Sequence, residues 1–141
     1  MVREIVIFGD PVLRKKCAKV ESFSDEIKSL VDDMLETMVS AEGIGLAAPQ
    51  IGVPIQLAVI DVSHDPECVS YLKIDGKEVQ LKDIMPLVFI NPELEYGEKD
   101  DVMSEGCLSF PDIRGDVIRP YDLKVSLDTV SYTHLTLPTK A

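Results

Sequence analysis

Apolar side chains recur every three or four positions between residues 23 and 41, at Phe23, Ile27, Leu30, Val31, Met34, Leu35 and Met38. This spacing is typical of a helix that buries one of its faces. Ser22 or Ser24 can cap the start of this helix, and Gly43 is well placed to end it. The pattern therefore predicts one long helix, and it assigns the methionines to the core and not to a cofactor site.

The remaining apolar segments are short and are bounded by proline, glycine or polar residues, which is typical of strands. Strands are predicted within residues 55–62, 86–91, 94–104 and 123–127, and a hairpin or a loop with a tight turn within residues 71–81. Residues 2–8 predict a strand or an extended segment. Because one long helix accompanies several strands without regular alternation, we expect an α+β fold with mainly antiparallel sheets around a long N-terminal helix.

Composition and charge narrow the class of protein. The chain has 141 residues, of which 45% are hydrophobic, so we expect one folded domain and not a disordered segment. Its 14 basic and 25 acidic residues give a net charge of -11, which disfavours direct binding to nucleic acid or to an anionic membrane surface. The three cysteines form no CxxC pair, and the N-terminus carries no secretory signal, so the sequence predicts a cytoplasmic protein without a membrane partner.

The segment Glu105-Gly106-Cys107-Leu108-Ser109 is the first candidate for chemistry, because it places a thiol two residues after a carboxylate. Cys107 is a structural cysteine, a nucleophile that needs a nearby base, or a metal ligand that needs further donors. The chain has only two histidines, His64 and His134, and neither belongs to an HExxH or HxxxH pattern. Spacing alone does not choose among these three roles.

The segment from Gly43 to Gln50, Gly-Ile-Gly-Leu-Ala-Ala-Pro-Gln, is the second candidate. It matches neither phosphate-binding pattern, GxGxxG or GxxxxGK[ST]. A tight turn between helix and strand explains its glycines, but two glycines around Ile44 also let a backbone lie against an extended ligand. The amide of Gln50 is a neutral donor that can polarise a carbonyl. We expect this segment and the Cys107 segment to face each other across one site.

These two segments, in this order, resemble the first two motifs of the peptide deformylase family. Asp10–Arg14 and residues 114–120 are similar to that family too, and the resemblance covers residues 1–128. It implies a hydrolase that removes the formyl group from the N-terminal methionine of nascent polypeptides, near the ribosome exit, as a monomer. It also implies a divalent metal, Fe2+ in the native enzyme with Zn2+ or Ni2+ possible in its place.

The resemblance also assigns roles to residues near the metal. Cys107 matches the thiolate ligand, which with two imidazoles would leave a fourth metal position for water. Gln50 matches the amide that binds the formyl oxygen together with the backbone N–H of Leu108. Glu105 matches a buried carboxylate near the metal, and Arg119 is a plausible partner for it.

A further set of roles concerns the substrate. By the same resemblance, Gly43, Ile44 and Gly45 form the strip that pairs with the substrate backbone and borders the methionine pocket. Arg114 matches a residue at the mouth of that pocket. An apolar pocket of this kind suits the unbranched side chain of methionine.

The sequence departs from the family at its third motif, HExxH on a C-terminal helix, which supplies two histidine ligands and the catalytic glutamate. No such motif occurs here, and His134 is not followed by a second histidine four residues later. We therefore expect residues 1–128 to be a truncated deformylase domain that lacks the C-terminal metal-binding helix and is inactive alone. Residues 129–141, rich in threonine and serine and without acids, are expected to be an atypical, non-native tail.

Two other functions remain open at this stage. One is a non-enzymatic module that binds formyl-peptides without a metal. The other is a hydrolase with Cys107 as nucleophile and His64 as its base, which requires the two side chains to be adjacent.

Overall fold

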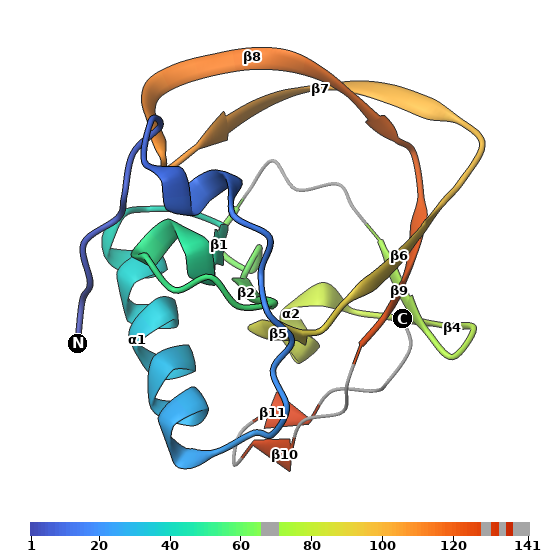
Figure 1. Cartoon of the computed structure of the whole chain (residues 1–141). Coiled ribbons are helices and arrows are strands. Elements are labelled where there is room, and N and C mark those ends of the chain that lie inside the picture. Colours follow the sequence, from blue (N-terminus) through green and yellow to red (C-terminus); the bar gives the residue numbers. More distant parts are fainter. Residues whose placement is uncertain (66–70, 128–130, 133–134, 137–141) are drawn as a thin grey trace.

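The computed structural model describes residues 1–65, 71–127, 131–132 and 135–136, the last four as backbone only (Figure 1). Its helices are η1 (Pro11–Arg14), α1 (Asp25–Ser40), η2 (Ala48–Ile51) and α2 (Leu81–Ile84), where η marks a 3-10 helix. Its strands are β1 (Gly45–Ala47), β2 (Leu57–Ile60), β3 (Leu72–Ile74), β4 (Lys77–Val79), β5 (Leu87–Ile90), β6 (Glu93–Tyr96), β7 (Asp100–Cys107), β8 (Phe110–Pro120), β9 (Leu123–Ser126), β10 (Ser131–Tyr132) and β11 (Leu135–Thr136). Residue 128, Cys68, His134 and most of the predicted tail 129–141 lie outside the described residues, so the expected division of the chain stays a prediction.

Helix α1 is the long helix that the apolar spacing predicts, and its two ends explain its length. The side-chain oxygen of Ser24 accepts a hydrogen bond from the backbone N–H of Ile27 at 3.3 Å, so Ser24 is the N-cap. At the other end Glu42 has a φ of 57° and the N–H of Gly43 bonds the carbonyl of Met38 at 2.9 Å. These are the contacts of a Schellman motif. The helix ends just before Gly43, as expected, and the left-handed position of the motif is taken by Glu42.

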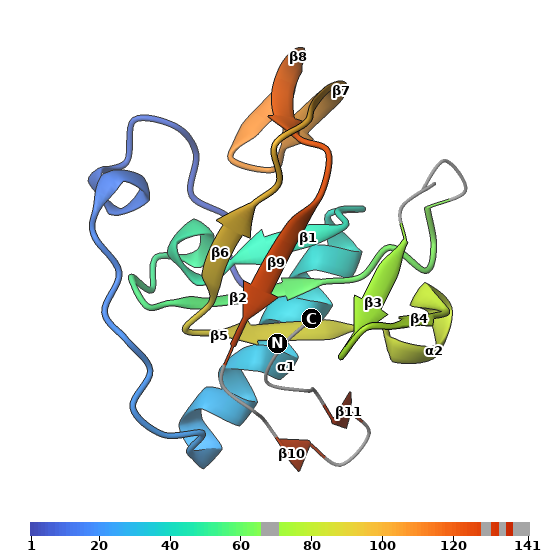
Figure 2. The ribbon, with the colours of Figure 1, turned by 90° about the vertical axis from the view of Figure 1, so that its right-hand side faces the viewer.

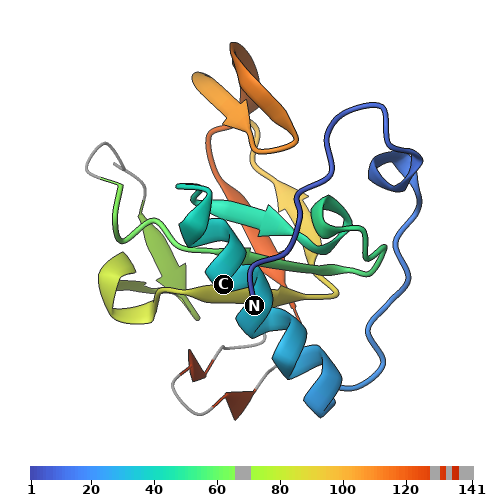
Figure 3. The same ribbon diagram turned by 90° about the vertical axis from the view of Figure 1, so that its left-hand side faces the viewer.

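Strands β1, β2 and β5 form an antiparallel sheet in that order. Figures 2 and 3, which view the molecule from opposite sides, show α1 on one face of this sheet and the β6–β9 pair on the other. Strand β5 is buried at three of its four positions, as expected for a strand covered on both faces. The fold is α+β, as predicted from the sequence.

The core lies between α1 and this central sheet. In α1, Val31 and Met34 have 0% exposure and Met38 has 1%, so the predicted apolar face is the buried face. The sheet contributes buried side chains that include Leu46, Leu57, Val59, Leu87, Val88 and Ile90, and the segment around β9 adds Val125 and Leu127. The assignment of the helix methionines to the core is confirmed.

The sequence predicts a single strand within residues 94–104, but the structure has two strands there, β6 and β7. Strand β6 pairs with β9, and β7 pairs with β8 to form a long antiparallel hairpin that arches away from the central sheet (Figure 1). The chain turns between the two strands at Gly97, whose N–H bonds the carbonyl of Asp122 at 2.9 Å. Sequence reasoning missed β8, because its two prolines and one glycine hide the alternation of a strand. Nearly every position of β7 and β8 is exposed.

The two remaining described segments agree with the sequence pattern. Strands β3 and β4 form the predicted hairpin, whose turn residues Asp75 and Gly76 both have positive φ, 50° and 82°. Residues 2–7 join no sheet in the described part of the chain and Phe8 begins a turn, so the strand alternative was wrong. No helix within the described ranges is both long and apolar enough to cross a bilayer.

Candidate functional site

The amide of Gln50 joins the two segments that the sequence singles out. Its Nε2 atom lies 3.6 Å from the Cys107 sulfur and 3.2 Å from the side-chain oxygen of Ser109. Its Oε1 atom accepts a hydrogen bond from the backbone N–H of Ala47 at 2.9 Å, which fixes which end of the amide faces the thiol. The structure thus brings together two segments that lie far apart in the sequence.

Local chemistry explains why Gln50 points this way. The chain leaves β1 directly into η2, where Pro49 supplies a φ that suits the first helical turn. The hydrogen bond from the Ala47 backbone N–H to Gln50 Oε1 is the second half of a capping box. Gly52 ends the turn with a φ of 83°, a left-handed conformation that favours glycine. Gln50 therefore sits on a short, well-determined turn.

A second close approach, at Gly43, joins the same two segments. A Cβ atom built on Gly43 would lie 2.7 Å from Cδ1 of Leu108. Glycine lets the backbone that follows α1 lie against the Leu108 side chain without displacing it. Among the residues that the resemblance assigns to substrate binding, Gly43 thus has a packing role that the structure shows directly.

The tip of the β7–β8 hairpin carries the thiol. The strand register shifts between Gly106 and Cys107, and Cys107 then pairs with Phe110. Such an irregularity changes the direction in which the following side chains point. Cys107 is exposed, whereas Ser109 has 2% exposure and bonds Gln50. The tip therefore exposes the thiol of Cys107 to solvent and buries the hydroxyl of Ser109.

Glu105 and Arg119 form an ion pair across the hairpin. Arg119 Nη2 lies 2.9 Å from Glu105 Oε1 and Arg119 Nε lies 3.0 Å from Oε2, a two-point contact. These hydrogen bonds from the guanidinium hold the pKa of the Glu105 carboxyl below its ordinary value and raise the pKa of Arg119. The Glu105 side chain is 32% exposed, so the expectation of a buried carboxylate was wrong. The hairpin is too thin to enclose it.

The other assigned residues lie on the same two segments. Arg114 donates a hydrogen bond from Nη2 to the carbonyl of Ser104 at 3.1 Å and packs against Gly106. Ile44 is 51% exposed, which leaves its side chain accessible to a ligand. Gly45 lies in β1 opposite Ile60 of β2. The roles of these residues in binding a substrate stay predictions.

Sequence reasoning missed three contributors to the site. The motif marks Ser109 only as its last residue, although the buried hydroxyl of Ser109 bonds Gln50. The backbone N–H groups of Val6 and Phe8 bond the carbonyls of Gln50 and Ser109, each at 2.8 Å. The apolar run at residues 5–8 is a signal of packing, but nothing in it indicates which segment it packs against.

Metal-ligating side chains are scattered over the described part of the chain. Within the described ranges no three histidine, cysteine, aspartate or glutamate side chains come together as a metal site. His64 is exposed in the loop after β2, and no hydrogen bond joins it to Cys107 in that part of the chain. The described residues around the Gln50 amide therefore offer a thiol and a hydroxyl, and no described hydrogen bond supports His64 as the base of a Cys107 nucleophile.

Comparison with known proteins agrees with the motifs. The family model of polypeptide deformylase matches residues 2–140. A peptide deformylase from Methylacidiphilum infernorum is 48% identical over 125 residues, 89% of this chain and 65% of the relative. One from Opitutus terrae is 47% identical over 122 residues, 85% of this chain and 63% of the relative. The chain thus spans somewhat less than two thirds of the length of these two relatives.

The fold gives the same answer. The crystal structure of peptide deformylase from Ehrlichia chaffeensis superposes with a TM-score of 0.79 at 34% identity, and the match covers 100% of this chain and 75% of that one. Sequence family, curated relatives and fold therefore agree. The chain belongs to the polypeptide deformylase family.

Proposed function

We propose that this chain carries the formyl-binding part of a site that hydrolyses N-formylmethionyl peptides. The observation that supports the proposal most is the contact of the Gln50 amide with Cys107 and Ser109, which unites two family motifs in one place. In the proposed setting the substrates are nascent chains near the ribosome exit, and the protein acts as a monomer in the cytoplasm.

In this proposal Gln50 holds the formyl oxygen. Its Nε2 atom carries two hydrogens, and the 3.2 Å contact with Ser109 engages one of them. The other faces the Cys107 sulfur at 3.6 Å, which is a weak acceptor, so this hydrogen can be shared with a ligand oxygen at little cost. With the backbone N–H of Leu108 as a second donor, it would stabilise the negative charge that develops when water adds to the formyl carbon.

The remaining proposed roles concern the peptide. Ile44, half exposed beside Gly43 and Gly45, offers an apolar wall for a methionine side chain. Arg114 lies across from Gly106, one residue before Cys107, where it can meet the chain of a bound peptide. The Glu105–Arg119 pair joins the two strands just behind the hairpin tip and so fixes the segment that bears the thiol.

The family is metal-dependent, and Cys107 is the residue proposed here as a metal ligand. A catalytic zinc-type site needs three protein ligands. The described residues bring one, so they do not form that site by themselves. Fe2+, Zn2+ and Ni2+ are the proposed candidates for the ion.

The experiment compares two proteins on N-formyl-Met-Ala, with metal analysis of both. One is the 141-residue chain. The other is a chimera that continues after residue 127 with the remaining part of the Methylacidiphilum infernorum relative. We expect turnover and a bound ion only in the chimera. A stoichiometric ion and turnover in the 141-residue chain would show that the described donors suffice after all.

A pair of glutamine variants of the chimera tests the proposed site itself. Gln50→Ala should lower kcat/KM by about 100-fold, the typical loss when one oxyanion donor is removed. Gln56→Ala is the matched control, since Gln56 Nε2 bonds the carbonyl of Cys17 at 3.2 Å. Equal activity of the two variants in a folded, metal-loaded chimera would overturn the role of Gln50.

A further inference from the structure

The tip of the β7–β8 hairpin has few attachments to the rest of the protein. The hairpin is exposed along most of both strands, so neither face is fixed by a core. Two of its attachments, Gln50 to Cys107 and Ser109 and Leu108 against Gly43, belong to the candidate site itself. Something else must fix the position of the tip, because a two-stranded ribbon is only marginally ordered without packing.

Residues 1–8, here called the N-terminal strap, provide another attachment. The backbone N–H of Phe8 bonds the carbonyl of Ser109 at 2.8 Å, and the rings of Phe8 and Phe110 stack with their centroids 5.3 Å apart. Two residues earlier, the N–H of Val6 bonds the carbonyl of Gln50 at 2.8 Å. The strap therefore contacts both halves of the site through adjacent hydrogen bonds.

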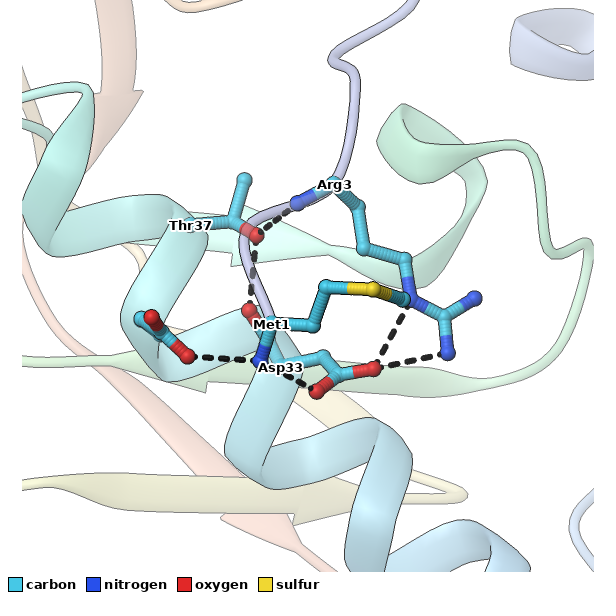
Figure 4. A network of polar contacts seen from close by, with 5 residues as sticks. Met1, Arg3, Asp33 and Thr37 are labelled. Atoms are coloured by element: carbon cyan, nitrogen blue, oxygen red, sulfur yellow. Dashed lines mark hydrogen bonds and ion pairs between the residues drawn. The ribbon is translucent and has the colours of Figure 1, made fainter.

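The other end of the strap is anchored on α1 (Figure 4). The backbone N–H of Arg3 bonds Thr37 Oγ1 at 2.8 Å, and Arg3 Nη2 lies 2.8 Å from Asp33 Oδ2. The Met1 ammonium lies 2.9 Å from Asp33 Oδ1 and 2.6 Å from a carboxylate oxygen of Glu36. Asp33 and Thr37 are buried, with 8% and 1% exposure, on the helix that forms the core.

We propose that Thr37 and Asp33 are positioning residues that act on the candidate site through this strap. From Arg3 to Phe8 the chain spans at most about 18 Å when extended. Because the segment is so short, the position of its anchor limits where its far end can lie. The rigid helix thereby sets where Gln50 and Ser109 meet, although neither Thr37 nor Asp33 touches them.

This inference deepens the proposed function, on which it rests for calling the Gln50–Cys107–Ser109 group a catalytic site. Its test requires no turnover, so the two can fail separately. Amide hydrogen exchange by NMR, measured on the 141-residue chain, reports local opening at each N–H. A merely structural role of Thr37 would speed exchange throughout the core, whereas a positioning role speeds it at the strap and the hairpin tip.

Thr37→Val and Thr37→Ser form the matched pair. Valine keeps the shape of threonine but removes the acceptor for the Arg3 N–H and the hydroxyl that donates to the Asp33 carbonyl at 2.7 Å, and serine retains both. With Thr37→Val we expect the exchange of the Val6 and Phe8 amides to rise about fivefold, the effect of the one hydrogen bond lost between the strap and α1. The side-chain amide signals of Gln50 should shift as well. Amides of Val59 in β2 should be unchanged, and Thr37→Ser should behave like the parent chain.

Asp33→Asn tests the same anchor through its charge and serves if Thr37→Val does not fold. It should raise the exchange of the Val6 and Phe8 amides selectively, while Glu36→Gln, which alters only the exposed contact with Met1, should have a smaller effect. Unchanged strap amides in every folded variant that loses an anchor contact would overturn the proposal. So would exchange that rises uniformly across the strap and the core.

Discussion

The body of the protein and the β7–β8 hairpin are built in opposite ways. The body packs α1 on a three-stranded sheet, with Val31, Met34 and Val59 at 0% exposure. The hairpin is the longest pair of strands in the described part of the chain, yet almost all of its residues face solvent. Its order comes from backbone pairing and from contacts at its tip. Stability therefore resides in the body, whereas the thiol of the candidate site lies on the part with the least packing.

The border between the two regions is where function is expected. Gln50 belongs to the body, and Cys107 and Ser109 belong to the hairpin. Residues of the border are held by single hydrogen bonds and by the close contact of Gly43 with the Leu108 side chain, so we expect small changes there to move the site without unfolding the body. Substitutions in the two regions should accordingly differ in kind as well as in size.

The largest effect is expected in the core of the body. Met34→Ala removes a fully buried side chain and should lower the free energy of unfolding by about 2–5 kcal/mol, through lost burial and the cavity left behind. Denaturant unfolding followed by circular dichroism measures it. Ile118→Ala in the hairpin, where the side chain is 68% exposed, is the control and should stay within about 0.5 kcal/mol. Equal losses would mean that the hairpin is packed in solution.

A substitution at the border should have the next largest effect. Gly43→Ala places a Cβ 2.7 Å from Leu108 Cδ1, so the Leu108 side chain or the hairpin tip must move, at a cost of about 1–3 kcal/mol. The same unfolding experiment measures the cost, and changed NMR signals at residues 107–109 would locate the shift. Gly115→Ala is the matched control, because a Cβ atom added there would face open space. A neutral Gly43→Ala with unshifted tip signals would refute the close contact.

The cap of α1 gives a smaller effect within the body. Ser24→Ala removes the acceptor for the Ile27 N–H and should cost about 1 kcal/mol. The midpoint of thermal unfolding serves as the measurement. Ser22→Ala is the control, since the structure assigns the cap to Ser24 alone. A larger loss with Ser22→Ala would place the helix start elsewhere.

The smallest effect concerns pH and the strap anchor. Hydrogen bonds from the Met1 ammonium, and then from Arg3, hold the pKa of Asp33 below its ordinary value of 3.8, with Glu36 as the other charged group at the site. Stability from this ionised carboxylate is fully present above that ordinary pKa and is lost as the pH falls through the lowered one. Arg3→Gln should raise the Asp33 pKa, as measured by the carboxyl 13C shift. An unchanged pKa would mean that the Arg3 contact is absent in solution.

The sequence predicts the body well because the signals for its elements are periodic or lie within a few neighbouring residues. The spacing of apolar residues in α1 and the Asp75-Gly76 turn each carry their own signal within a few residues. Strand β8 carries none, since its pairing with β7 is set by long-range register and its faces are both solvated. The expected burial of Glu105 was also wrong, because burial depends on how the layers of the fold cover a residue. A short motif contains no information about that covering.

The sequence predicts which residues belong to the candidate site, but not which residues hold them in place. The residues Gln50 and Cys107 are identified by motifs, and their proximity is a property of the fold. Ser109, Val6 and Phe8 hold them through buried or backbone groups, which leave no mark in the sequence. The pairing of Glu105 with Arg119 was predicted only in part. Opposite charges suggest a pair, but the register places Glu105 opposite Gly115 and Arg119 opposite Asp101, so only the folded hairpin shows that the two side chains meet.

The most direct test of the account is a nuclear Overhauser measurement on the isotopically labelled 141-residue chain. If Gln50 joins the two segments, its side-chain amide hydrogens will show cross-peaks to the β-hydrogens of both Cys107 and Ser109. Absence of both cross-peaks, in a sample whose α1 and central-sheet signals show the body to be folded, would contradict the shared site.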